Sequence, residues 1–209
     1  QFLLHHGQQR LIIEIEQRRD RAAKEDAPEH LAGRGAIGAP EHRIDAAAAR
    51  ELVRHALKVV DGTKCEVVIN DYWQAAISEG ADHIHLGQED LETADVSTIK
   101  KAGLTLGIST HDHDELEIAL RHKPDYVALG PIYETTLKKM HFAPQGYARI
   151  TEWKKLIGKT PLVAIGGIKL EHAREIFAAG ADSIAVVSDV TQNPDPERRI
   201  LDWLALTRA

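Results

Sequence analysis

Residues 66–90, EVVINDYWQAAISEGADHIHLGQED, decide the fold. They hold two short and nearly continuous apolar runs, 66–70 and 83–86, on either side of a segment that suits a helix. Strands covered on both faces read as continuous apolar runs, and a helix between two of them makes a parallel strand–helix–strand unit. The first run ends in Asn70 and is followed by Asp71, and the second is followed by Gly87 to Asp90. The stretch therefore predicts a parallel sheet whose strands end in candidate functional residues.

The same alternation continues to the end of the chain. We expect strands at residues 66–70, 83–86, 104–108, 126–130, 162–165 and 184–187. Apolar residues at helical spacing form stripes at Leu116/Ala119/Leu120, Ile150/Trp153/Leu156/Ile157, Ala173/Ile176/Phe177 and Ile200/Leu201/Trp203/Leu204. Such stripes face a core rather than a cofactor. The pattern predicts an α/β protein with a (β/α)₈ (TIM) barrel, formed by residues 1–209 as one domain.

The first quarter of the chain fits this pattern poorly. A barrel of eight strands needs two more strands in residues 1–64. Residues 45–60 predict a helix, Leu11–Ile15 is the only strand-like run, and residues 16–44 follow neither period. Residues 1–44 are therefore atypical. They are a divergent strand–helix–strand region, a disordered extension, or the product of a shifted reading frame joined to the proper frame near Pro40.

Composition limits the classes of partner. The 209 residues carry a net charge of −6, with a pI near 6.1. That charge does not attract nucleic acid or membrane surfaces, so we expect small-molecule partners held by local donors, lysines or a metal. The sequence lacks an apolar run of membrane-spanning length and a secretory leader, which predicts a cytoplasmic protein. Cys65, the only cysteine, opens an apolar run and is expected to be buried and inert. The sequence is compatible with a homo-oligomer.

Two aspartates at neighbouring strand ends are candidate metal ligands. Asp71 and Asp90 each follow an expected strand, and the carboxyl ends of barrel strands carry the functional residues. Mg²⁺ is typically held by one or two carboxylates together with substrate phosphates. The alternative is that each aspartate caps the helix that follows, since aspartate is a favoured N-cap residue. The pair, taken with the neighbouring motifs, favours the metal.

Glycines and a serine follow the last two strands. Gly166-Gly167 and Val187-Ser188 occupy the positions where barrels commonly bind phosphate through backbone amides. Glycine lets the backbone approach phosphate oxygens closely. A tight turn without a ligand is the alternative. Position favours the phosphate site.

Lys138 and Lys139 lie in a long segment, from Tyr133 to Gly146, after the strand at 126–130. The segment exceeds an ordinary connection in length, which indicates a functional loop. A lysine here can stabilise negative charge on a leaving group. A solvated surface pair is the alternative, and the position at the strand ends favours the functional interpretation.

Three histidines need an interpretation. His111 and His113 stand beside aspartates at an expected helix start, where capping and solvent exposure account for them. His85 lies inside a strand, so we expect a hydrogen-bonded interior histidine rather than a catalytic base.

Six strings of the sequence together resemble the successive motifs of the thiamine phosphate synthase family. They are VINDYW (68–73), HLGQED (85–90), LGISTH (106–111), ALGPIY (128–133), APQG (143–146) and VAIGGI (163–168). The resemblance covers residues 65–209, and six motifs in the same order are specific where one alone would be weak.

The resemblance implies a transferase that joins a pyrimidine diphosphate to a thiazole phosphate and releases pyrophosphate, by a dissociative mechanism with Mg²⁺. It implies metal ligands at Asp71 and Asp90. It also implies diphosphate contacts from Asn70, Ser109 and Lys138, of which Ser109 and Lys138 would act in catalysis. The thiazole phosphate would be held by Thr135, Gly167, Val187 and Ser188.

The sequence departs from the family pattern in two places. Leu137 stands where the family usually has a threonine, and residues 33–41 lack the Gln-x-Arg-x-Lys motif of the family's second strand. Two other functions are therefore considered, a thiazole tautomerase on the same barrel and an inactive paralogue that binds phosphorylated ligands. Asp71, Asp90 and Lys138 argue against the tautomerase.

Overall fold

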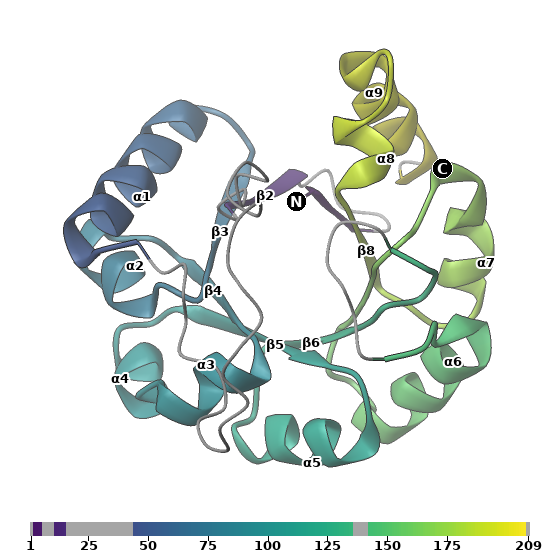
Figure 1. Cartoon of the computed structure of the whole chain (residues 1–209), viewed down its shortest axis with the longest axis horizontal. Helices are drawn as coiled ribbons and strands as arrows, with labels where there is room; N and C mark the ends of the chain where they lie inside the picture. Colours follow the sequence, from purple (N-terminus) through teal and green to yellow (C-terminus); the bar gives the residue numbers. More distant parts are fainter. Residues whose placement is uncertain (1, 6–10, 16–43, 136–141, 208–209) are drawn as a thin grey trace, which may run out of the picture.

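The chain folds into a closed barrel of eight strands, seen in a computed structural model that describes residues 2–5, 11–15, 44–135 and 142–207 (Figure 1). The strands are β1 (Phe2–His5), β2 (Leu11–Ile15), β3 (Glu66–Asn70), β4 (His83–Leu86), β5 (Thr105–Thr110), β6 (Tyr126–Leu129), β7 (Leu162–Ile165) and β8 (Ser183–Val186). Each strand pairs with its neighbours in chain order, and β1 closes the ring against β8. The expected α/β barrel is confirmed.

The first strand departs from an all-parallel barrel. Strands β2 to β8 pair in parallel, but β1 runs antiparallel to both β2 and β8. Only five residues separate His5 from Leu11, whereas a crossover between parallel strands needs a dozen or more. The sequence correctly indicated the strand at Leu11–Ile15 and missed the one at Phe2–His5. An eight-stranded barrel required two strands in residues 1–64, and only one of them was recognisable in the sequence.

The six strands expected after residue 65 are all present. The ranges 66–70, 83–86 and 162–165 match β3, β4 and β7. Strand β5 starts one residue later than the expected 104–108 and ends at Thr110, while β6 and β8 each end one residue early. These shifts are within the usual uncertainty of strand ends.

Helices form an outer ring around the strands, as Figure 1 shows. They are α1 (Ala46–Val60), α2 (Trp73–Glu79), α3 (Gln88–Thr93), α4 (Val96–Lys101), α5 (His113–Arg121), α6 (Gly146–Ile157), η1 (Leu170–His172), α7 (Ala173–Ala178), α8 (Ser188–Thr191) and α9 (Pro196–Thr207). Helix α1 begins at the expected place because the Asp45 side chain accepts hydrogen bonds from the amides of Ala47 and Ala48. Within the described ranges, no helix has both the length and the apolar character to cross a membrane.

The core has an outer and an inner part. Outward-pointing strand residues such as Ile84, Leu106 and Ile184 are fully buried beneath the helices. A smaller cluster of Val68, Ala128, Val163 and Ala185 fills the inside of the barrel. The alternation follows from the pleat, which points successive side chains to opposite faces.

Three expectations about burial were wrong. Leu156 and Leu201, assigned to the apolar stripes of α6 and α9, are 53% and 59% exposed. Their neighbours Ile157 and Trp203 face the core instead. Each helix thus buries a narrower stripe than its sequence contains. Cys65 is partly buried rather than buried, because it precedes β3 instead of lying within it.

A buried hydrogen-bond chain ties α6 to the barrel wall. The indole N–H of Trp153 donates to Thr110 Oγ1 at 2.9 Å, and that hydroxyl donates to the Ala128 carbonyl at 2.9 Å. Thr110 and Trp153 are fully buried. We expect Thr110→Val to lower the free energy of unfolding by about 1–3 kcal/mol, because it leaves a buried indole N–H without an acceptor.

The control is Thr110→Ser, which keeps the hydroxyl and should cost only about 1 kcal/mol for the lost methyl group. Urea unfolding of the three proteins measures both changes. A valine variant as stable as the serine variant would show that the hydrogen bond contributes little.

Candidate active site

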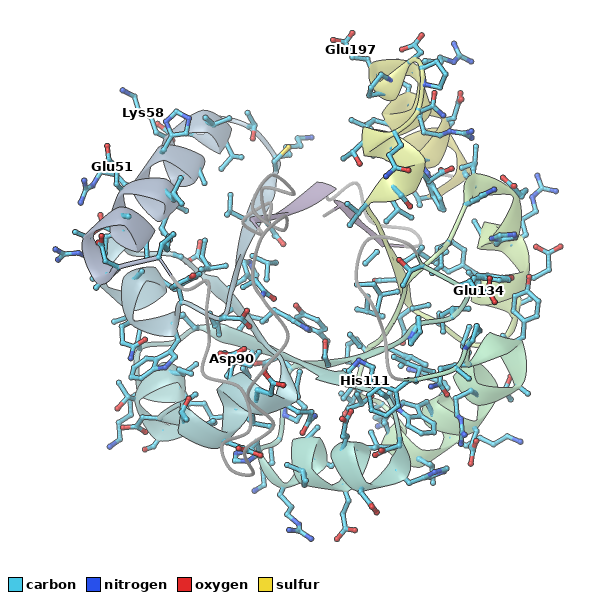
Figure 2. All side chains as sticks on the ribbon, in the orientation of Figure 1. Glu51, Lys58, Asp90, His111, Glu134 and Glu197 are labelled. Atoms are coloured by element: carbon cyan, nitrogen blue, oxygen red, sulfur yellow. The ribbon has the colours of Figure 1, made fainter. Side chains whose placement is uncertain are left out.

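The carboxyl ends of the parallel strands meet at one end of the barrel and carry nearly all of the predicted site residues. Asn70 and Asp71 follow β3, Asp90 lies just after β4, Ser109 lies in β5, Thr135 follows β6, Gly167 follows β7, and Val187 and Ser188 follow β8. This end is where barrel enzymes bind their substrates. Figure 2 shows Asp90 and His111 beside the strands, whereas Glu51, Lys58 and Glu197 project from the outer ring.

Asp71 is held in an unusual backbone conformation at the end of β3. Its φ is +66°, in the left-handed region that residues other than glycine seldom adopt. Its amide donates to the His85 carbonyl at 2.9 Å, and its carboxylate accepts from Asn70 Nδ2 at 2.5 Å. The N-cap of α2 is Tyr72. Asp71 is therefore not the N-cap residue of the next helix.

Asp90 lies in the first turn of α3, whose N-cap is Gly87. It therefore does not occupy the N-cap position either. Its Oδ2 would lie 3.7 Å from a Cβ at Gly87, so the carboxylate turns back toward the end of β4. Its Oδ1 is buried. Each aspartate is thus held at the carboxyl end of its strand, β3 or β4, and these two strands are neighbours.

A polar chain crosses the inside of the barrel just below the two aspartates. His85 Nε2 lies 2.8 Å from Ser109 Oγ, and His85 Nδ1 lies 3.0 Å from Tyr126 Oη. His85 is buried, and burial lowers its pKa to about 4 because the charged imidazolium loses its hydration. The interior, hydrogen-bonded histidine expected from the sequence is confirmed.

This lowered pKa makes stability depend on pH. The unfolded chain, in which His85 has a pKa near 6.5, binds more protons than the folded chain between pH 6.5 and about 4. The contribution of neutral His85 is therefore fully present above pH 6.5 and is lost as the pH falls through that window. It amounts to at most about 3 kcal/mol.

We expect the difference in unfolding free energy between the wild-type protein and His85→Gln to be larger at pH 7 than at pH 4.5. Glutamine keeps a polar side chain but does not titrate in this range. Urea unfolding at both pH values measures the difference. A gap that stays constant would mean that His85 binds protons equally in the folded and unfolded chains, so that burial does not lower its pKa.

The glycine pair after β7 packs against the loop that follows β6. Gly166 and Gly167 have φ values of +96° and +66°. The Gly166 carbonyl accepts from the Tyr133 amide at 3.0 Å, and a Cβ on Gly167 would lie 2.3 Å from the Glu134 carbonyl oxygen. The pair therefore has a packing role of its own, whether or not a phosphate binds there.

Val187 and Ser188 mark the change from β8 to α8. Val187 is the N-cap residue, and its carbonyl accepts from the amides of Val190 and Thr191. Because β7 and β8 are paired through Ile165 and Ala185, the Gly166-Gly167 turn and the start of α8 follow adjacent strands. The structure thus brings the two halves of the predicted phosphate site to the same side of the barrel.

Comparison with known proteins decides the family. The family model described as thiamine monophosphate synthase matches residues 12–190. A thiamine-phosphate synthase of Rhizobium etli is 56% identical over 158 residues, which are 76% of this chain and 78% of that protein. This chain belongs to the thiamine monophosphate synthase family. The match begins within β2, so the family pattern extends into the first quarter of the chain.

Other members of the thiamine monophosphate synthase family are also similar. A thiamine-phosphate synthase of Neisseria meningitidis serogroup B is 46% identical over 157 residues, which are 75% of this chain and 76% of that protein. The solved structure of a thiamine phosphate pyrophosphorylase from Pyrococcus furiosus superposes with a TM-score of 0.67. It is 23% identical and covers 80% of this chain and 81% of that chain, so it supports the barrel fold alone.

Two predicted features of the family site lie outside the described residues. Lys138, with Leu137 and Lys139, falls between Thr135 and Phe142, and residues 33–41 precede residue 44, where the described chain resumes. Thr135 is the last described residue before that gap. The lysine remains a prediction from the sequence.

The outer histidines behave largely as the sequence indicated. Asp112 is the N-cap of α5, and His113 Nε2 lies 2.8 Å from Glu152 Oε1 on the surface. The hydrogen bond with His113 is the main reason why the pKa of Glu152 is lowered. His111 is more enclosed than expected, because it stacks on Phe142 at 4.5 Å between ring centroids.

Sequence reasoning missed three side chains, two at the mouth of the barrel and one inside the barrel below the mouth. Gln88 Nε2 donates to the Ser109 carbonyl at 2.6 Å, and Gln145 Nε2 donates to the His111 carbonyl at 3.0 Å. Tyr126 contacts His85 across β5. The glutamines belong to quoted family strings, which was the available signal. The tyrosine, at the start of an apolar run, gave none.

Proposed function

We propose that this chain joins 4-amino-5-hydroxymethyl-2-methylpyrimidine diphosphate to a hydroxyethylthiazole phosphate, giving thiamine phosphate and pyrophosphate. The observation that carries the proposal is the position of the family motifs. Five of the strings run past the carboxyl ends of β3, β4, β5, β6 and β7, which lie at one end of one barrel. A shared mouth allows a diphosphate and a monophosphate to be held side by side.

The reaction proceeds by dissociation. The bond between the pyrimidine methylene carbon and the diphosphate oxygen breaks, and pyrophosphate leaves with the electron pair. The thiazole nitrogen then donates its lone pair to the resulting pyrimidinylmethyl cation, forming the new C–N bond. No proton is transferred in either step, so the site does not need a general base. Its tasks are to stabilise the charge of the leaving group and to exclude water from the cation.

Asp71 and Asp90 are the proposed ligands of a Mg²⁺ ion. They fit that ion because hard carboxylate oxygens suit Mg²⁺, and because each is held at a strand end without serving as an N-cap. Among the described residues, no group of three or more His, Cys, Asp or Glu side chains gathers as a metal cage. Two carboxylates with substrate phosphate oxygens are a donor set that Mg²⁺ accepts. When bound, the ion neutralises negative charge on the diphosphate.

The diphosphate would be contacted by Asn70, Ser109 and Lys138. The Asn70 amide already donates to Asp71, which places it beside the metal ligands. The Ser109 backbone is fixed through its carbonyl by Gln88, and its hydroxyl faces His85 inside the barrel. A lysine in the loop after β6 would add a positive charge near the departing pyrophosphate.

Thr135, Gly167, Val187 and Ser188 are proposed to hold the thiazole phosphate. We expect an anion near the Gly167 and Ser188 amides when crystals are soaked with sulfate or with the thiazole phosphate. Backbone N–H groups at a strand end bind such anions without charge from the protein. The reading would fail if both amides proved to be bonded to protein atoms while the anion bound elsewhere.

Turnover separates this function from the two alternatives. A transferase needs both substrates and releases pyrophosphate, whereas a thiazole tautomerase converts a thiazole phosphate in the absence of the pyrimidine. A non-catalytic paralogue binds phosphorylated ligands and forms no product. Product analysis with each substrate alone and with both together therefore distinguishes all three.

A further inference from the structure

Four inward-facing positions form one row across neighbouring strands. Asn70 of β3 pairs with His85 of β4, His85 with Gly107 of β5, and Gly107 with Tyr126 of β6. The row lies just below the mouth, because Asn70 immediately precedes Asp71 and Ser109 lies two residues beyond Gly107. A tyrosine and a histidine on strands that are not adjacent are thereby brought within reach of each other.

Gly107 makes that contact possible. A Cβ at Gly107 would lie 1.9 Å from Cζ of Tyr126, so the tyrosine ring occupies the space directly over this glycine. The ring reaches across β5, where its hydroxyl lies 3.0 Å from His85 Nδ1. Any other residue at 107 would displace the ring and break the contact. The glycine serves the Tyr126–His85 pair.

The direction of the hydrogen bonds decides what Ser109 can do. A serine hydroxyl has one hydrogen to donate, and phosphate oxygens accept hydrogen bonds. If Ser109 donated to His85 Nε2, its hydrogen would point into the barrel. If His85 Nε2 carries the hydrogen instead, Ser109 Oγ accepts from the imidazole and its own hydrogen is free for an anion. The second arrangement leaves Nδ1 as an acceptor, and the Tyr126 hydroxyl lies where it can donate to that atom.

We propose that Tyr126 and His85 are positioning residues, which fix the Nε2–H tautomer of His85 so that the Ser109 hydroxyl donates to an anionic oxygen of the substrate. The inference rests on the proposed contact of Ser109 with the diphosphate. The same serine is fixed a second time, because Gln88 holds its carbonyl at 2.6 Å. The side chain of Ser109 is thus oriented by His85 and its backbone by Gln88.

The test compares variants that keep or remove the hydrogen donor to Ser109. His85→Gln places an amide N–H near the position of Nε2, whereas His85→Asn places its amide near Nδ1 and leaves Ser109 without that donor. Ser109→Ala should lower kcat/KM about 10²-fold, as for the loss of one preorganised donor. His85→Asn should approach that value and His85→Gln should lose less. Tyr126→Phe should lose about 10-fold, because only the tautomer preference is removed.

Two readouts separate positioning from a purely structural role. In a double variant, adding His85→Asn to Ser109→Ala should cost little more, since both changes remove the same contact. The ¹⁵N shifts of the His85 ring should report Nε2–H in the wild-type protein and a mixture of tautomers in Tyr126→Phe. This second measurement needs only the wild-type protein and one mild variant, so it decides the matter even where His85→Asn does not fold.

The outcomes distinguish this inference from the proposed function. Full activity in Ser109→Ala would overturn the proposed diphosphate contact, and the inference with it. A strong loss in Ser109→Ala, combined with an Nδ1–H tautomer in the wild-type protein or with multiplicative losses in the double variant, would overturn the positioning role alone. A structural role predicts that the losses of kcat/KM in the two single variants multiply in the double variant. The positioning role predicts that the double variant loses little more than Ser109→Ala alone.

Discussion

Asp90→Asn and Asp71→Asn are each expected to lower kcat/KM by about 10²–10³-fold or more. In the proposed function these carboxylates supply the local negative charge that holds a cation against the diphosphate, and losing one preorganised electrostatic contact costs about that much in rate. Asparagine is the right replacement. It has nearly the same shape, and it tolerates the left-handed φ of Asp71, so a loss of activity cannot be attributed to backbone strain.

The matched control is Glu89→Gln, which removes one negative charge from the same turn of α3. Glu89 is exposed and belongs to the first turn together with Asp90. We expect it to change kcat/KM by less than about 2-fold, as for an exposed charge in water. Steady-state assays over a range of Mg²⁺ concentrations should also show that the aspartate variants need more of the ion. If the aspartate variants match Glu89→Gln in kcat/KM and in their Mg²⁺ requirement, the proposed metal site is contradicted.

A Gln-x-Arg-x-Lys strand in place of residues 33–37 is expected to raise the rate of this chain by about 10²-fold or more. A departing pyrophosphate carries several negative charges, and the protein itself has a net charge of −6. Only local cations offset that repulsion. Residues 33–41 contain one arginine, Arg34, and no lysine, and they lack the spacing of the family's Gln-x-Arg-x-Lys motif, so Lys138 and the proposed metal ion are the main cations left for this task. The replacement removes Arg34 but supplies an arginine and a lysine at the spacing of the motif, which should restore transition-state stabilisation.

A second chimera with Gln-x-Ala-x-Ala in the same place controls for the change of backbone sequence. If both chimeras are equally active, charge is not what the first quarter of the chain lacks. If the unaltered chain is as active as the charged chimera, the present N-terminal region supplies the missing contacts by another route.

The later strands could be predicted because each is covered on both faces. Residues 67–69 and 162–165 are continuous apolar runs, which are typical of doubly covered strands, and the structure has strands at the expected 66–70 and 162–165. Strand β1 could not be found in this way. Its four residues, Phe2–His5, are too few to show a period, and its antiparallel pairing depends on β8 at the other end of the chain.

The sequence predicts at which strand ends the site residues lie, but it does not predict which residues they contact. Strand ends place Asp71, Asp90 and Gly167 at one mouth, and this follows from the parallel order alone. The contact between His85 and Tyr126 joins residues 41 positions apart, and it exists because Gly107 lacks a side chain. No local pattern contains that information. Such contacts become visible only once the register of three strands is known.

The most direct test of this account is product formation by the unaltered chain. The protein is incubated with the pyrimidine diphosphate, the thiazole phosphate and Mg²⁺, and thiamine phosphate and pyrophosphate are quantified together. The account predicts equal amounts of both products, formed only when both substrates and the ion are present, and lost in Asp90→Asn. Conversion of the thiazole phosphate without the pyrimidine, or tight binding of both substrates with neither product formed, would contradict it.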